Sequence, residues 1–262
     1  MGILNVTPDS FSDGGKFLAR DAALRQAESM AAAGASIIDV GGESTRPGSD
    51  DVSEQQELDR VVPVIEALVG GVEAAVSIDT SKPGVMRAAI RAGAGMINDI
   101  RALREDGALR AAAELKVPVC LMHMQGLPGT MQESPSYDNV VVEVKDFLAG
   151  RISACRDAGL DEELLIVDPG FGFGKTRQHN IELLANLRQL EQLGCPILAG
   201  LSRKATLGEL TGRDVDERVP ASVAAAVIAV TRGADIVRVH DVRETVDALR
   251  IAAAVIESDR NR

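Results

Sequence analysis

Aromatic side chains are scarce in this sequence: phenylalanine, tyrosine and tryptophan together make up 2% of its 262 residues, and tryptophan is absent. Three of the five phenylalanines, Phe11, Phe171 and Phe173, fall in glycine-rich segments. Glycine loops lose much conformational entropy on ordering, so rings placed in them predict flat surfaces offered to a ligand rather than to the core.

Other absences exclude whole classes of protein. Cys120, Cys155 and Cys195 stand far apart without Cys-x-x-Cys spacing, which argues against a disulfide framework and a zinc site and predicts small buried thiols. No apolar run approaches the roughly 18 to 20 residues that cross a bilayer. The segment after Met1 lacks the pattern of a signal peptide. We therefore expect a cytoplasmic protein with no membrane partner.

Basic residues are in the minority. The chain has 39 acidic and 28 basic side chains and a formal net charge of -11. This balance opposes non-specific binding to nucleic acid or to anionic membranes. An anionic substrate would need a local group of cations to overcome it.

The sequence does contain a regular alternation of short apolar runs, polar residues, loops and alanine-rich stretches with helical spacing. Its 45% hydrophobic content is ample for a large core. The apolar runs lie at residues 2–4, 37–40, 75–78, 96–97, 119–122, 164–167, 197–198 and 236–239. The helical patterns lie at 20–33, 53–68, 83–92, 107–115, 139–158, 179–193, 204–210 with 219–232, and 242–257.

Eight strands alternating with helices predict an α/β fold, the (β/α)8 TIM barrel, as a single domain over residues 1–262; an open doubly wound sheet is the alternative. In TIM barrels the active site lies at the carboxyl ends of the strands. We expect the polar residues at these ends to converge: Asn5, Asp39, Asp79, Asp99, His123, Asp168, Ser202 and His240.

The loops after the first two strands each allow two interpretations. After Asn5, a long polar segment with an exposed Phe11 predicts a mobile lid, although its composition is that of many structural loops. After Asp39, two glycines, two hydroxyls and Arg46 predict an oxyanion-binding turn. Alternatively, Arg46 pairs with Glu43 in a solvated loop.

The third and fourth strands end at Asp79 and at Asn98-Asp99. A carboxylate and an amide together can bind the donor edge of a heterocycle such as a guanine-like or pterin ring. Alternatively, Asp79 caps the helix that begins near Pro83. His123 has no metal-ligating neighbours at suitable spacing, so we interpret it as structural.

The sixth strand runs into Asp168 and a segment in which three glycines alternate with two phenylalanines ahead of Lys175. A P-loop would need glycine at position 169, where the chain has Pro169, so an NTPase motif is rejected. Lys175 is left without a predicted role.

Cations gather after the last two strands. Ser202-Arg203-Lys204 leads into a helix, so free backbone N–H groups and two cations meet there. Arg238 and His240 lie two residues apart on the eighth strand and share one side of it. Because the loops after strands seven and eight often bind phosphate in TIM barrels, the two motifs together predict an anion site.

Five motifs occur in register: GILNVTPDSFSDGG at 2–15, DVGGESTRPG at 39–48, DPGFGFGK at 168–175, SRK at 202–204 and RVHD at 238–241. Together they resemble the bacterial dihydropteroate synthases over essentially the whole chain. The resemblance implies a pterin-binding barrel and a transferase of folate biosynthesis. It would join 6-hydroxymethyl-7,8-dihydropterin pyrophosphate to p-aminobenzoate and release 7,8-dihydropteroate and pyrophosphate.

The resemblance also implies roles for individual residues. Asp79, Asp168 and Lys204 would be catalytic. The pterin would be bound by Asp79, Asn98, Met122, Asp168, Phe173 and Lys204. Pyrophosphate would be bound by Asn5, Arg238 and His240, with Asn5 acting partly through Mg²⁺ as its metal ligand. The p-aminobenzoate pocket and its loops would comprise Phe11, Thr45, Arg46, Pro47, Phe173 and Ser202.

Anion-binding groups without a dedicated nucleophile predict a dissociative order, in which pyrophosphate leaves before the amine attacks. Two rivals remain: a pterin-binding methyltransferase domain, and a catalytically silent barrel that binds a phosphorylated metabolite. The resemblance further implies inhibition by sulfonamides and a homodimer formed through the last helices. Family members carry additional residues before the first motif, so the first strand is expected to be short here.

Overall fold

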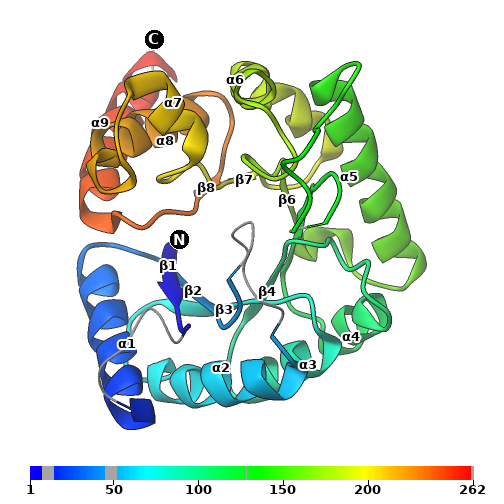
Figure 1. The fold of residues 1–262 in the computed structure, drawn as a ribbon, viewed down its shortest axis with the longest axis vertical. Helices are drawn as coiled ribbons and strands as arrows, with labels where there is room; N and C mark the ends of the chain where they lie inside the picture. The colour runs from blue at the N-terminus through cyan, green and yellow to red at the C-terminus, as the bar shows by residue number, and fades with distance from the viewer. Residues whose placement is uncertain (8–14, 45–51, 128, 261–262) are drawn as a thin grey trace.

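The computed structural model describes residues 1–7, 15–44, 52–127 and 129–260 of the chain. Its strands form a closed parallel ring at the centre of the molecule (Figure 1). β1 to β6 pair in chain order as one sheet, and β7 pairs with β8 as a second. The strands are β1 (Gly2–Asn5), β2 (Ile37–Gly41), β3 (Ala75–Asp79), β4 (Met96–Asp99), β5 (Val119–Met122), β6 (Leu165–Asp168), β7 (Leu198–Ala199) and β8 (Ile236–Val237).

Two isolated parallel bridges join the two sheets. Val167 of β6 pairs with Ile197, just before β7, and Gly2 of β1 pairs with Val239, just after β8. The second junction is held by two backbone hydrogen bonds of 3.0 Å, from Ile3 N to Val239 O and from Val239 N to Met1 O. The ring is therefore complete, and the predicted TIM barrel is confirmed over the open doubly wound alternative.

Helices surround the ring (Figure 1). Most lie close to their predicted ranges: α1 (Gly15–Ala32), α2 (Glu54–Leu68), α3 (Pro83–Arg91), α4 (Ala108–Leu115), α5 (Val140–Asp157), α6 (Arg177–Ala185), α7 (Ala205–Thr211), α8 (Val219–Thr231) and α9 (Val242–Arg260). Short 3₁₀ turns are η2 (Glu162–Leu164), η3 (Leu187–Leu193) and η4 (Val215–Glu217). Within the described ranges, none of the helices is long and apolar enough to cross a membrane.

One predicted helix is divided. The pattern at 179–193 becomes α6 and the 3₁₀ turn η3, separated at Asn186. The Asn186 side chain donates from Nδ2 to the carbonyl of Glu182 at 2.9 Å, and its backbone leaves the helical region at φ -111°. An asparagine that bonds the preceding turn with its own side chain ends the α-helix there.

The interior of the ring changes character along the strands. An apolar cluster at one end combines side chains from seven strands or their immediate flanks: Met1, Ile37, Met96, Cys120, Ile166, Leu198 and Ile236. Because side chains alternate across a strand, the residues two positions further along face the same interior. These residues include Ile3, Asp39, Asn98, Met122, Asp168 and Arg238. The interior therefore has an apolar floor and a polar mouth at the carboxyl ends.

Candidate functional site

A guanidinium bridges two carboxylates in the mouth of the barrel. Arg238 donates from Nε to Oδ2 of Asp39 at 2.6 Å and from Nη2 to Oδ2 of Asp79 at 2.8 Å. Asp39 is fully buried, and Asp79 is only partly exposed. Since Asp79 is paired across the barrel with Arg238, and Lys82 occupies the N-cap position of α3, the alternative helix-capping role for Asp79 is rejected.

Neighbouring strand ends meet at one level of the ring. Asn5, Gly41, Asp79 and Asn98 are successive partners in the registers of β1 to β4. Asn98 donates from Nδ2 to Oδ2 of Asp39 at 2.9 Å. A carboxylate, an amide and a guanidinium therefore share this part of the mouth, as heterocycle recognition requires.

The opposite side of the mouth contains Asp168, Lys204 and Phe173. The Lys204 ammonium lies 4.1 Å from the centroid of the Phe173 ring, a cation–π contact. Phe173 also packs against a cluster formed by Met122, Met124 and Met131. The predicted pterin set is thus brought together: two carboxylates, an amide and an ammonium surround an apolar wall.

Burial changes the proton affinities of these groups. Loss of solvation raises the pKa of Asp79 to about 7, against the opposing effect of Arg238, and raises the pKa of Asp168 to about 6, against its bond from Gly170 N. Burial lowers the pKa of Lys204 to about 8, with Asp168 acting in the other direction. The site therefore holds groups whose charge changes close to neutral pH.

The three glycines after Asp168 are required by their backbone conformation and by crowding. Gly170, Gly172 and Gly174 have φ values of 67°, 79° and 60°. A Cβ on Gly170 would lie 1.9 Å from His123 O, and one on Gly174 would lie 2.4 Å from Gln125 O. A side chain at either position would clash with the backbone after β5.

Lys175 braces this loop from inside. Its side chain is buried, and its Nζ lies 2.9 Å from Gly170 O, 3.0 Å from Phe173 O and 2.9 Å from His123 Nδ1. Asn180 adds a second brace, because its Oδ1 accepts from Gly172 N at 2.8 Å. Lys175 thus has a structural role that its sequence position did not disclose.

The prediction that the rings in glycine-rich segments all face a ligand is wrong for Phe171. This residue is among the largest fully buried side chains of the core. Phe173, two residues later, lies beside Met122 and Lys204 instead. Phe171 and Phe173 therefore have separate roles in one short loop.

Two strand-end residues also depart from the expected convergence. Asp99 accepts from the backbone N–H groups of Arg101 and Leu103, each at 2.8 Å, and from the Ser81 hydroxyl. His123 faces Lys175 and packs edge-on against Phe147. Both residues organise loops around the mouth, which agrees with the structural interpretation of His123.

The predicted anion-binding residues after β7 and β8 are partly engaged with each other. Ser202 Oγ lies 3.0 Å from His240 Nδ1 and accepts from the His240 backbone N–H at 3.2 Å. Burial, followed by Arg238, lowers the pKa of His240 to about 4. Arg203 forms a bidentate ion pair with Asp241. Of the two predicted cations, Lys204 is the one whose charge acts on Asp168.

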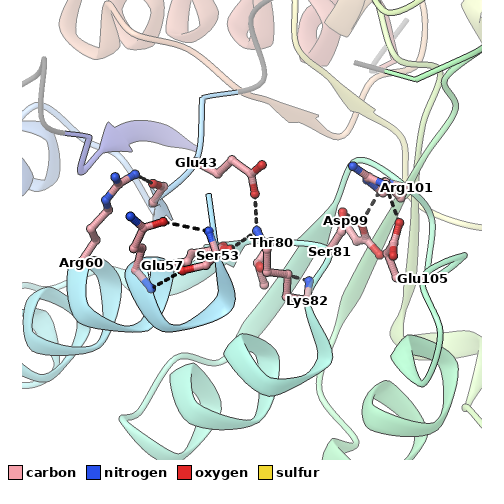
Figure 2. A network of polar contacts seen from close by, with 12 residues as sticks. Glu43, Ser53, Glu57, Arg60, Thr80, Ser81, Lys82, Asp99, Arg101 and Glu105 are labelled. Carbon is pink, nitrogen blue, oxygen red and sulfur yellow. Dashed lines mark hydrogen bonds and ion pairs between the residues drawn. The ribbon is translucent and has the colours of Figure 1, made fainter. Parts of the chain in front are cut away.

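An ion-pair network lies beside the start of the β2–α2 connection (Figure 2). The Lys82 ammonium pairs with Glu43, just after β2, and with Glu57 of α2 at 2.7 Å. Arg60 donates to the carbonyl of Gly42 at 2.7 Å. Glu57 is fully buried, and its Oε1 has no hydrogen-bond partner among the described residues. Glu43 is therefore held by Lys82, while Arg46, its partner in the predicted alternative, lies outside the described residues.

Four predicted residues, Phe11, Thr45, Arg46 and Pro47, lie outside the described residues. Asn5, the predicted metal ligand, ends β1 next to Gly41. Because Gly41 has no side chain, space remains beside Asn5: even a Cβ there would lie 3.6 Å from Asn5 Oδ1. The described residues contain no group of three or more His, Cys, Asp or Glu side chains that could hold a metal by themselves.

Sequence reasoning missed Asp39 as a site residue, although it marked the end of the second strand. The available signal was periodicity: Asp39 is two residues from Ile37 and from Gly41 on the same face of β2. A carboxylate in that pattern must face the barrel interior, where it needs a cation.

Comparisons with known proteins agree with this architecture. The family model described as "Pterin binding enzyme" matches residues 1–240. The chain is 53% identical to the dihydropteroate synthase of Escherichia coli (strain K12) over 262 residues, which cover 100% of this chain and 93% of that protein.

Two solved structures have the same fold. The Yersinia pestis dihydropteroate synthase with a sulfonamide drug complex has a TM-score of 0.94 and 54% identity, covering 98% of this chain and 94% of that chain. The Xanthomonas albilineans dihydropteroate synthase with 4-aminobenzoic acid has a TM-score of 0.92 and 55% identity, covering 97% and 92%.

Proposed function

The chain belongs to the dihydropteroate synthase family, and from that premise we propose that it joins 6-hydroxymethyl-7,8-dihydropterin pyrophosphate to p-aminobenzoate. The products are 7,8-dihydropteroate and pyrophosphate. The observation that carries the proposal is the grouping of Asp79, Asn98, Asp168 and Lys204 around the wall formed by Met122 and Phe173.

The pterin is bound by groups of complementary polarity. The carboxylates of Asp79 and Asp168 accept hydrogen bonds from ring N–H and amino groups, and Asn98 offers a carbonyl oxygen. The Lys204 ammonium donates to the pterin carbonyl, and its stem packs over Gly172, where a Cβ would lie 3.1 Å from Lys204 Cδ. The pterin ring packs against Met122 and Phe173.

Arg238 and His240 stabilise the pyrophosphate. Ser202 Oγ accepts the His240 backbone N–H, so its own hydroxyl proton is available to His240 Nδ1. The neutral imidazole then carries its proton on Nε2 and donates it to a phosphate oxygen.

Magnesium fits the residues around Asn5. This ion commonly takes one or two protein oxygens and completes its shell with water and substrate phosphates, and Asn5 Oδ1 beside Gly41 offers one such oxygen. When bound, Mg²⁺ would neutralise charge that develops on the leaving pyrophosphate.

We infer a dissociative order of bond changes. The methylene C–O bond breaks first, and both electrons leave with pyrophosphate. Asp79 and Asp168 stabilise the positive charge on the pterin through its ring nitrogens. The lone pair of the aromatic amine then forms the C–N bond, and the nitrogen releases one proton to water, so no strong base is required.

The p-aminobenzoate pocket is assigned to Ser202 and Phe173, together with Phe11, Thr45, Arg46 and Pro47. A homodimer through the last helices is supported by exposed apolar side chains at Leu210, Ile228, Ile251 and Val255. Light scattering at several protein concentrations tests the dimer. The proposal also places the enzyme in the cytoplasm, with small molecules rather than nucleic acid or membranes as partners.

Pyrophosphate release with both substrates present tests the proposed function. Wild-type protein should release one pyrophosphate for each 7,8-dihydropteroate formed, and Lys204→Ala should lose at least about 100-fold in kcat/KM, because one substitution removes an ammonium from the pterin and from Asp168. Lys145→Ala, which alters an exposed hydrogen bond to Gln192, is the control. A folded wild-type protein that never binds p-aminobenzoate would instead favour a pterin-binding methyltransferase domain or a silent barrel.

A further inference from the structure

Asp39 is a charged side chain in the barrel interior to which the substrate contacts assign no role. Its carboxylate is 0% exposed. Its Oδ2 accepts from Asn98 Nδ2 at 2.9 Å and from Arg238 Nε at 2.6 Å, whereas Oδ1 has no partner within the described part of the chain. Both hydrogen bonds thus converge on a single oxygen.

That oxygen fixes the orientation of the Asn98 amide. An ionised carboxylate can only accept hydrogen bonds, so Asn98 must present its NH₂ group to Asp39. The amide carbonyl Oδ1 of Asn98 is then directed away from Asp39. Without an acceptor at this position, the amide could rotate by half a turn and exchange its donor for its acceptor.

Arg238 compensates the buried negative charge of Asp39, but Asp39 is not the only ion-pair partner of Arg238. The guanidinium pairs with Asp39 through Nε and with Asp79 through Nη2. Removal of Asp39 would therefore leave Arg238 held by Asp79. It would also remove a negative charge from the region where an anion is to be bound.

We propose that Asp39 is a positioning residue, which orients Asn98 so that the amide carbonyl accepts a hydrogen bond from the pterin. The inference rests on the proposed function. It assigns Asp39 no contact with either substrate, because the Asp39 side chain is fully buried. Its effect comes from an acceptor oxygen at the position of Oδ2.

Because Oδ1 of Asp39 has no hydrogen-bond partner among the described residues, Asp39→Asn is a conservative variant. The amide introduced by Asp39→Asn can place its carbonyl oxygen at the Oδ2 position and its NH₂ group at the Oδ1 position, and so keep both accepted hydrogen bonds. Asp39→Leu has a similar shape but no acceptor. Ser77→Ala is the matched control, because Ser77 is the register partner of Asp39 on β3 and its buried hydroxyl makes no hydrogen bond among the described residues.

Calorimetric titration with 6-hydroxymethylpterin, and separately with inorganic pyrophosphate and Mg²⁺, tests the inference. We expect Asp39→Leu to bind the pterin at least about 10-fold more weakly, as loss of one well-placed hydrogen bond predicts. Asp39→Asn should stay within about threefold of wild type. Neither variant should bind pyrophosphate more weakly than wild type, because both lose a buried negative charge. In an Asn98→Ala background, Asp39→Leu should cause no further loss of pterin affinity.

Three results would overturn the role of Asp39: unchanged pterin affinity in Asp39→Leu, equal loss in Asp39→Asn and Asp39→Leu, or parallel loss of pterin and pyrophosphate affinity. The last pattern would indicate a merely structural residue. If Asp39→Leu does not fold, Asp39→Ala also removes the acceptor and is compared in the same way. A wild-type protein that binds no pterin would contradict the proposed function itself.

Discussion

Lys175 Nζ lies 2.9 Å from Nδ1 of His123, in the buried base of the β6–α6 loop. Burial lowers the pKa of Lys175 to about 7, with Asp168 acting in the other direction. When Lys175 is an ammonium it can only donate, so the imidazole nitrogen of a neutral His123 is then the acceptor. Burial, reinforced by Lys175, lowers the pKa of His123 to about 2. With the carbonyls of Gly170 and Phe173, the imidazole provides an acceptor for each of the three ammonium protons.

Loss of the Lys175 ammonium should destabilise the protein. We expect Lys175→Met to lower the free energy of unfolding by about 3 kcal/mol or more, because three buried acceptors lose their donor. Urea denaturation followed by circular dichroism measures this change. Lys145→Met, at an exposed hydrogen bond, should change little. Equal stability of the two variants would contradict the bracing role.

A second substitution tests the network of Figure 2. Lys82→Met leaves the fully buried carboxylate of Glu57 without its cation, so the free energy of unfolding should fall by about 3–5 kcal/mol. Arg87→Met is the matched control, because Arg87 pairs with the exposed Glu114, and its effect should be much smaller. The double variant Lys82→Met with Glu57→Leu should recover part of the loss, as differential scanning calorimetry can show.

The two phenylalanines of the glycine loop should separate stability from activity. Phe171→Ala removes a fully buried core ring and should cost about 3–5 kcal/mol of stability. Phe173→Ala should cost much less stability but raise KM for the pterin substrate at least about 10-fold, because the ring loses its packing partner. Steady-state kinetics and urea denaturation on both variants provide the comparison. Similar changes in stability and in KM for the two variants would contradict the separate roles of Phe171 and Phe173.

Activity should depend on pH in a bell shape. The raised pKa values of Asp168, about 6, and Asp79, about 7, mean that both carboxylates lose their bound proton only as the pH rises through this range. Since we propose that the carboxylate forms accept the pterin donors, kcat/KM should rise from pH 6 to 7. The lowered pKa of Lys204, about 8, predicts a fall above that pH.

A substitution at Lys204 tests the cause of the expected fall in kcat/KM at alkaline pH. Lys204→Arg replaces the ammonium with a group that stays charged throughout this range. Its kcat/KM should be lower overall but should no longer fall between pH 8 and 9. If the variant keeps the same alkaline limb, Lys204 is not the group that titrates.

Sulfonamides should compete with p-aminobenzoate in this enzyme. We propose that Phe11, Thr45, Pro47 and Ser202, all present in the sequence, belong to this pocket. Sulfanilamide should raise the apparent KM for p-aminobenzoate without changing kcat, because enough p-aminobenzoate displaces it. An inhibitor that instead lowers kcat at saturating p-aminobenzoate would place its binding elsewhere.

The sequence predicted the fold well because the barrel repeats one local pattern. Short continuous apolar runs, glycines after helices and a capping residue such as Asn139, whose side chain accepts from Val141 and Val142 N, are all local signals. The interruption of the helix at Asn186 was not predicted, because the apolar spacing continues across the break. Its interruption depends on one side-chain bond that competes with the helical backbone.

The candidate site was predictable to the extent that strand ends determine it. Asp79, Asn98 and Asp168 could be placed in the mouth from their position alone. Pairings across the barrel could not be predicted: Arg238 with Asp39 joins residues 199 positions apart, and Lys175 with His123 joins residues 52 apart. The opposite orientations of Phe171 and Phe173 depend on positive φ values at the glycines between and around them, which residue spacing does not encode.

Closure of the ring has a consequence for biosynthesis. One edge of β1 pairs with β2, but the other bonds to Val239, which the ribosome adds only after β2 to β8. β1 must therefore keep an unsatisfied edge while β2 to β8 are made, and such edges invite pairing with other chains. A nascent chain arrested before β8 should bind chaperones at this edge, and release should coincide with the synthesis of residues 236–240.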